Sequence, residues 1–180
     1  MESISKRKWF ILLITGVAAT TAGIVIYRKH KTQIMNLLDK TKLALVGRSI
    51  NKIIVHCTAT RPSQACTVEL IDQWHRERGF DCIGYHYVIY RDGSVHEGRP
   101  LSKVGAHCVG QNSDSIGISY CGGVAEDGTT PQDNRTEAQK ASLRQLIKEL
   151  RQAYGDIPVY GHRDFANKAC PSFDAKSEYN

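Results

Sequence analysis

Several motifs that would mark a zinc enzyme of a familiar kind are missing from the sequence. There is no HExxH motif, so a metalloprotease site with both imidazoles on one helix is excluded. There is no PCxxC pair, because Cys170 is followed by Pro171 and by no second cysteine, which argues against a zinc deaminase. Beyond the N-terminal segment no stripe of lysine and arginine is interleaved with aromatic residues, so no nucleic-acid partner is expected.

The cysteine pattern does not resemble a disulfide framework. If Cys170 binds a metal, an odd number of cysteines remains, and these cannot all pair within the chain. We therefore expect buried thiols rather than a disulfide scaffold. The 6 cysteines stand at positions 57, 66, 82, 108, 121 and 170.

Charge is absent from one long run near the N-terminus, between Trp9 and Tyr27, and basic residues flank the run on both sides. At about 1.5 Å per residue the run is just long enough to cross a ~30 Å hydrocarbon core, with its two aromatic ends at the interfaces. We predict a membrane anchor or signal anchor at residues 1–31. The alternative is a cleaved signal peptide, because the small residues in the middle of the run resemble a cleavage region.

The remaining bulk properties indicate one domain and an affinity for acidic surfaces. With 180 residues and 41% hydrophobic composition, the chain can form one domain of about 130 residues plus an appendage. The net charge of +6 favours anionic lipid or anionic cell-wall polymer. Residues 32–49 have a rough helical period and are predicted to be a linker, so the functional domain is expected at 50–180.

Hydrophobic periodicity predicts a single α/β domain with a mixed β-sheet flanked by helices, preceded by the N-terminal hydrophobic helix. Thr67 is a suitable cap for the first helix of the domain, and Thr136 with Gln139 forms a capping box for the second. The expected order is a strand at 53–55, a helix at 68–78, a hairpin of 84–90 with 95–97, a strand at 115–120, a helix from 136 to about 154 and a strand at 158–161.

Three side chains are candidate metal ligands. His56 follows the apolar strand residues Ile-Ile-Val, His162 follows the strand Pro-Val-Tyr-Gly, and Cys170 lies in the next polar loop. Two imidazoles and a thiolate suit a catalytic zinc site whose fourth position is left to water. Taken singly, each residue has an ordinary alternative, a hydrogen-bonded structural histidine or a small buried thiol.

Four motifs together resemble one known family. IIVHCTAT, GYHYVIYRDGSVHEGRP, VGAHCVGQNSDSIGISY and GHRDFANKACP occur in the order found in zinc-dependent N-acetylmuramoyl-L-alanine amidases, which include T7 lysozyme-like enzymes and peptidoglycan recognition proteins. The resemblance spans about residues 50–175 and implies one Zn²⁺ ion on His56, His162 and Cys170. It further implies that Tyr85 and Lys168 are catalytic, with a solvated lysine and a structural tyrosine as the alternatives.

The resemblance also implies a substrate groove beside the site. His107, Asn112 and Ser115 fall in the stretch that borders this groove in the family, and we expect them to bind substrate; the alternative for His107 is a structural role. The expected reaction is hydrolysis of the amide between N-acetylmuramic acid and L-alanine in peptidoglycan, in phage-type lysis or wall remodelling. A noncatalytic peptidoglycan-binding module is the competing function.

The predicted anchor and the resemblance together give an expected location and assembly. We expect a monomer held at the membrane by its N-terminal helix, with the catalytic domain facing the periplasm or cell wall. Small and hydroxylated residues lower the cost of leaving lipid, so release of the anchor is a second expectation.

Overall fold

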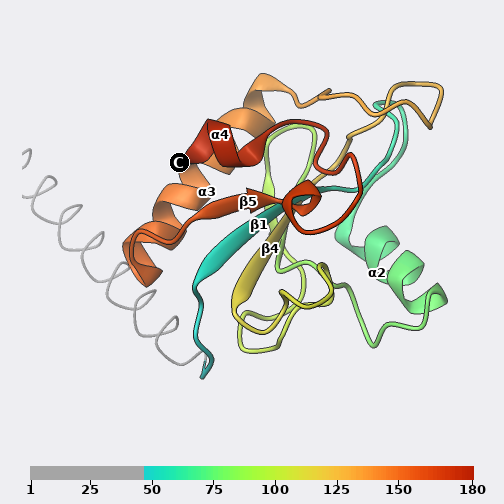
Figure 1. The fold of residues 1–180 in the computed structure, drawn as a ribbon. Helices are drawn as coiled ribbons and strands as arrows, with labels where there is room; N and C mark the ends of the chain where they lie inside the picture. The colour runs from blue at the N-terminus through green and yellow to red at the C-terminus, as the bar shows by residue number, and fades with distance from the viewer. Residues whose placement is uncertain (1–46) are drawn as a thin grey trace, which may run out of the picture. The chain divides into compact units, whose positions relative to one another are not determined.

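A mixed sheet of 5 strands lies at the centre of the computed structural model (Figure 1). Strand β1 lies between β4 and β5 and is parallel to both; β2 is parallel to β4 and antiparallel to β3. The predicted mixed sheet is therefore confirmed. The strands are β1 (Lys52–Cys57), β2 (Tyr87–Ile89), β3 (Val95–Glu97), β4 (Ser115–Tyr120) and β5 (Val159–Gly161), in the order β3-β2-β4-β1-β5.

The structure describes residues 47–180, which belong to one compact unit. The predicted membrane segment at 1–31 and most of the predicted linker lie outside these residues. Within residues 47–180 no helix has both the length and the apolar character needed to span a bilayer. The predicted domain start at residue 50 stays a prediction.

Two capped helices cover opposite faces of the sheet (Figure 1). Helix α2 (Val68–Glu77) begins at Thr67, whose hydroxyl accepts the Leu70 N–H, as predicted. Helix α3 (Glu137–Tyr154) begins with the predicted capping box of Thr136 and Gln139. Two short elements were not predicted, the 3₁₀ turn η1 (His162–Asp164) and helix α4 (Ala175–Tyr179), because neither is long enough to show a helical period.

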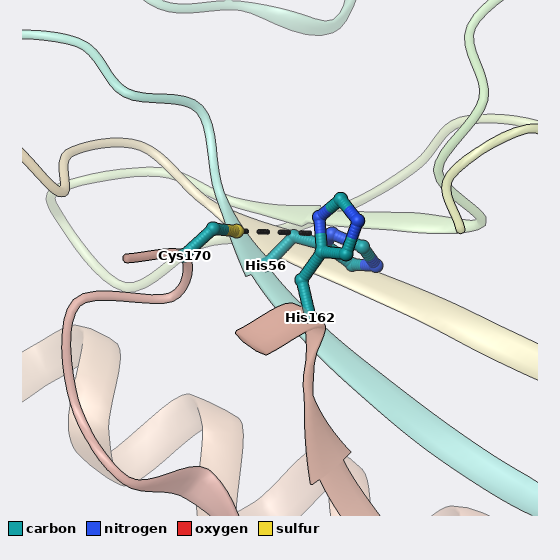
Figure 2. Close-up of side chains that lie close together, drawn as sticks. All are labelled: His56, His162 and Cys170. Carbon is teal, nitrogen blue, oxygen red and sulfur yellow. Dashed lines mark hydrogen bonds between the residues drawn. The ribbon is translucent and has the colours of Figure 1, made fainter. Parts of the chain in front are cut away.

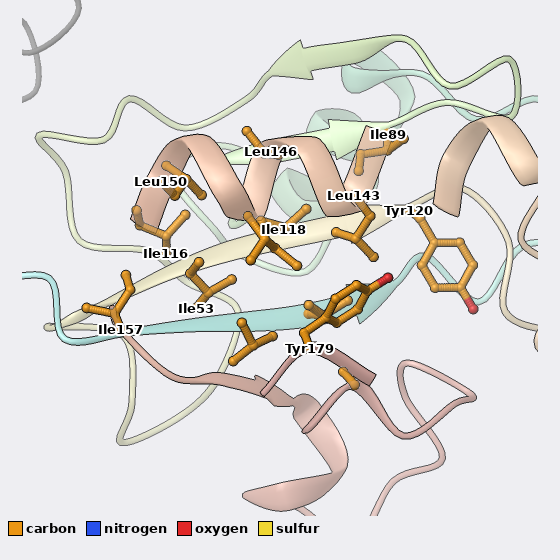
Figure 3. Packing of buried hydrophobic residues seen from close by; sticks show 14 of the residues in the cluster. Ile53, Ile89, Ile116, Ile118, Tyr120, Leu143, Leu146, Leu150, Ile157 and Tyr179 are labelled. Atoms are coloured by element: carbon orange, nitrogen blue, oxygen red, sulfur yellow. The ribbon is translucent and has the colours of Figure 1, made fainter. Parts of the chain in front are cut away.

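The main apolar core lies between the sheet and helices α3 and α4 (Figure 3). Alternation along β1 places Ile53 and Val55 in this core and turns Ile54 and His56 to the other face. The same alternation in β4 puts Ile116 and Ile118 in the core. A smaller cluster on the other face joins Ile71 of α2 to Val88 of β2. That face also carries the buried histidines of the candidate site.

The cysteine prediction needs one correction. Cys66 and Cys121 form a disulfide, whereas Cys57, Cys82, Cys108 and Cys170 are free. The pairing joins the loop before α2 to the end of β4, two segments 55 residues apart in sequence. Tertiary folding brings these segments together, so the spacing of the cysteines gave no sign of the bond.

Candidate metal centre and active site

Parallel strands bring the predicted ligands to one edge of the sheet. His56 is the fifth residue of β1, and His162 follows the neighbouring parallel strand β5 directly. Carboxyl ends of parallel strands meet at the same edge, so the two imidazoles approach each other, with ring centroids 4.7 Å apart. Cys170, in the loop after η1, completes the group (Figure 2).

The three donors are close enough to share one metal ion. A ligand atom from each of His56, His162 and Cys170 can be chosen so that all lie within 4.8 Å of one another. The Sγ atom of Cys170 lies 3.8 Å from Nδ1 of His56, and a tetrahedral zinc ion would place such a pair about 3.5 Å apart. The cluster is therefore consistent with a zinc site.

Burial keeps the imidazoles of the cluster neutral. Desolvation lowers the pKa of His56 well below its usual value, and neighbouring His107 lowers it further. Desolvation also lowers the pKa of His162, and the positive charge of Lys168 adds to the effect. At neutral pH each ring therefore carries one proton and one lone pair, which is the form that binds a metal.

Two thiols meet at the base of the cluster. The backbone N–H of Cys57 donates to the Cys170 Sγ atom at 3.3 Å. The hydrogen bond with the Cys57 thiol and burial together raise the pKa of Cys170. The same contact lowers the pKa of Cys57 to about 7 despite its burial. A cation in the cluster would favour the Cys170 thiolate, because a coordinating thiol loses its proton.

The predicted catalytic side chains lie around the cluster. The half-buried ring of Tyr85 lies 5.2 Å from that of His56, and burial raises the pKa of its phenol. Tyr85 is thus a protonated hydrogen-bond donor at neutral pH. Lys168 is exposed on the loop between η1 and Cys170, near enough for its charge to lower the pKa of both ligand histidines.

The three predicted substrate-binding residues form one hydrogen-bonded group behind His56. His107 is 8% exposed, and its Nδ1 atom lies 3.0 Å from Nε2 of His56. Asn112 Oδ1 accepts the backbone N–H of His107 and of Cys108. Ser115 is fully buried, with Oγ 3.3 Å from His107 Nε2. Both His107 ring nitrogens, Asn112 Oδ1 and Ser115 Oγ thus face protein groups, and contact with substrate stays a prediction.

Sequence reasoning overlooked two neighbours of the site in β4. Ser119 pairs in register with His56 and is fully buried, and its hydroxyl interacts with the Tyr85 phenol. Gly117 leaves space for the ring of His107, which a Cβ atom at this position would overlap. A glycine inside a strand often marks such a close approach, so Gly117 was a usable signal.

Comparison with known proteins supplies independent information. The family model for N-acetylmuramoyl-L-alanine amidase matches residues 46–173. The endolysin of Escherichia phage T7 is 45% identical over 128 residues, which cover 71% of this chain and 84% of the endolysin. Peptidoglycan-recognition protein SC2 of Drosophila melanogaster is 29% identical over 97% of this chain and 95% of its own length.

A solved structure agrees with this likeness at the level of the fold. The N-acetylmuramoyl-L-alanine amidase LysC from Clostridium intestinale superposes with a TM-score of 0.62 at 31% sequence identity. The match covers 74% of this chain and 83% of LysC. The sequence match and the fold match therefore indicate the same group of proteins.

Proposed function

Because the chain belongs to the N-acetylmuramoyl-L-alanine amidase family, we propose that it hydrolyses peptidoglycan with one zinc ion held by His56, His162 and Cys170. The chain is an N-acetylmuramoyl-L-alanine amidase, and its substrate is the amide that joins N-acetylmuramic acid to L-alanine. The single observation that carries the zinc assignment is the convergence of two neutral imidazoles and one thiol at the edge of the sheet.

The donor set fits zinc in type and number. Imidazole nitrogen and thiolate sulfur are common zinc ligands, and three protein ligands leave a fourth position for water or substrate. When bound, zinc would supply an activated water nucleophile and a Lewis acid for the scissile carbonyl. No carboxylate of an HExxH motif is present to handle protons, so this task falls to other side chains.

Tyr85 and Lys168 are the side chains we assign to that task. The Tyr85 phenol, kept protonated by its raised pKa, donates a hydrogen bond to the oxygen of the scissile carbonyl as negative charge develops there. The Lys168 ammonium group stabilises the same charge or gives a proton to the leaving nitrogen. Water adds to the carbonyl and the C–N bond breaks, which leaves a lactyl carboxylic acid and the free amine of L-alanine.

Purified cell wall provides the test. We expect zinc-dependent release of L-alanine amino termini without new reducing sugars, loss of release with a chelator, and recovery when zinc is added back. The variant Cys170→Ser should release little at any zinc concentration used for the wild type. A protein that binds cell wall but releases no amino termini in any of these conditions would instead be the noncatalytic binding module.

We further propose that residues 1–31 hold the enzyme at a membrane, with the catalytic domain facing the cell wall, as in phage-type lysis. The support is the uncharged run between Trp9 and Tyr27 and its basic flanks. Cells that produce the full chain, or a chain without residues 1–31, should be fractionated. The full chain should sediment with membranes and the shortened chain should not; full chain found only in the soluble fraction would contradict the anchor.

A further inference from the structure

A chain of three hydrogen bonds runs from the candidate ligand His56 into the interior of the domain. Nε2 of His56 lies 3.0 Å from Nδ1 of His107, and Nε2 of His107 lies 3.3 Å from Oγ of Ser115. Oγ of Ser115 in turn lies 2.6 Å from the carbonyl oxygen of Gln111. His56, His107 and Ser115 are all buried, so water does not compete for these bonds.

The last bond of the chain determines the direction of the others. A carbonyl oxygen only accepts, so the single hydroxyl proton of Ser115 must point to Gln111. Ser115 Oγ can then only accept from His107, which places a proton on Nε2 of His107. A neutral His107 has no proton left for Nδ1, so this atom accepts from Nε2–H of His56.

The direction of these hydrogen bonds determines which ring nitrogen of His56 has a free lone pair. A neutral His56 with its proton on Nε2 has a bare Nδ1, and this is the atom that faces Cys170 Sγ at 3.8 Å. We propose that His107 and Ser115 are positioning residues that fix the Nε2–H tautomer of His56 and so present Nδ1 to the metal. This inference rests on the proposed zinc site and assigns to both residues a role other than substrate binding.

The surroundings of His107 hold its ring in the orientation that the chain needs. Its ring lies in a slot between Gly105 and Gly117, where a Cβ atom on either glycine would overlap it. Asn112 Oδ1 accepts the backbone N–H of His107 at 2.9 Å and so closes the loop from His107 to Asn112. The ring therefore has little freedom to turn over and exchange its donor and acceptor atoms.

Loss of such an outer hydrogen bond typically lowers metal affinity roughly 10–100-fold. In His107→Leu no acceptor remains for His56, and we expect a weakening in that range. His107→Asn places Oδ1 near the former position of Nδ1, because both atoms are bonded to Cγ, so affinity should largely recover. In Ser115→Ala the His107 proton loses its acceptor, and zinc affinity should fall as well.

A matched control for Ser115→Ala lies in α3. The Ser142 hydroxyl donates to the carbonyl oxygen of Gly93 at 2.6 Å, the same kind of bond at the same length but away from the cluster. Ser142→Ala should leave zinc affinity unchanged. Affinities should be measured on the full chain in detergent by competition with a chelator of known zinc affinity, alongside the thermal unfolding midpoint of each variant.

The tautomers provide a readout that does not depend on activity. In the zinc-loaded full chain, ¹⁵N spectra of the histidine rings should show ligation of His56 through Nδ1 and a proton on Nε2 of both His56 and His107. Ligation through Nε2 of His56, or a proton on Nδ1 of His107, would overturn the proposal even if no variant folds. Equal zinc affinity in His107→Leu and wild type would overturn it too.

Failure of this inference can be told from failure of the proposed function. If the wild type binds no zinc or cleaves no cell wall, the proposed function is wrong. If the wild type binds zinc and cleaves, but the tautomers or the affinities disagree with the expectations above, only the positioning role is wrong.

Discussion

The sulfur of Cys170 accepts a hydrogen bond from the backbone N–H of Cys57, the residue that directly follows the ligand His56. The third ligand is thus tied to the strand that carries the first, although 113 positions separate the two cysteines in sequence. Hydrogen bonds to a charged acceptor are stronger than those between neutral groups, so this contact favours a thiolate at Cys170.

Cys170→Ser should remove the thiolate ligand with little change in volume. Loss of a residue that only hydrogen-bonds to a ligand lowers metal affinity by up to about 100-fold. Because this substitution removes a ligand itself, we expect zinc affinity to fall by more than that. Zinc content after dialysis measures the effect. Cys82→Ser, at another free cysteine, is the control and should retain zinc; equal zinc content in both variants would remove Cys170 from the ligand set.

Zinc binding should release about one proton below pH 7 and fewer above it, because the Cys57 thiol that contacts Cys170 has a pKa of about 7 and can take up the proton. The pKa of Cys170 is raised, so the thiol is protonated before binding and deprotonated after it. The pKa values of His56 and His162 are lowered, so neither carries an extra proton to lose at this pH. Zinc affinity should therefore rise with pH up to neutrality and level off above it. Calorimetry at pH 6 in two buffers of different ionisation enthalpy measures the proton count, and a count of zero at this pH would contradict the assignment.

Tyr85→Phe and Lys168→Ala should slow catalysis without loss of metal. Removing one proton donor or hydrogen-bond donor from a transition state typically costs roughly 10²–10⁴-fold in rate. Phenylalanine retains the ring that packs beside His56, so the fold should persist. The measurement is kcat on a soluble muropeptide, with zinc content determined in parallel. If the variants lose zinc in proportion to their loss of activity, these residues stabilise the metal site and do not take part in the reaction.

Removing the disulfide should lower the free energy of unfolding without changing the rate of the reaction. The bond between Cys66 and Cys121 closes a loop with a sequence separation of 55, for which chain entropy gives about 4 kcal/mol. The double variant Cys66→Ser, Cys121→Ser should unfold at a lower temperature than wild type, and reductant should lower only the wild-type midpoint. If both proteins unfold at the same temperature without reductant, the bond contributes nothing.

Much of the scaffold could be predicted because its signals are local. Alternating apolar residues marked β4, and side-chain caps marked the starts of α2 and α3. The first residue of β2 was harder to predict. The predicted strand began at Gly84, but its N–H donates to the side chain of His75, and the observed strand begins only at Tyr87.

The residues of the candidate site could be predicted from the sequence, but some of the contacts between them could not. His56 and His162 each stand where a predicted strand ends, so their convergence follows once the two strands are neighbours. The contact between His56 and His107 joins residues 51 positions apart, and no periodic pattern reports it. The role of Ser115 depends on a hydroxyl direction that only three-dimensional neighbours define.

The central position of β1 in the sheet also affects how the domain responds to mechanical force. A pull on the chain upstream of Gly47 first loads the hydrogen bonds of the Arg48 side chain and then β1, which is hydrogen-bonded to β4 on one edge and to β5 on the other. Force along a strand loads such bonds together in shear, and they must break nearly at once. An enzyme that is held at this end while it is bound to a rigid polymer would therefore resist unfolding by the force between the two attachment points.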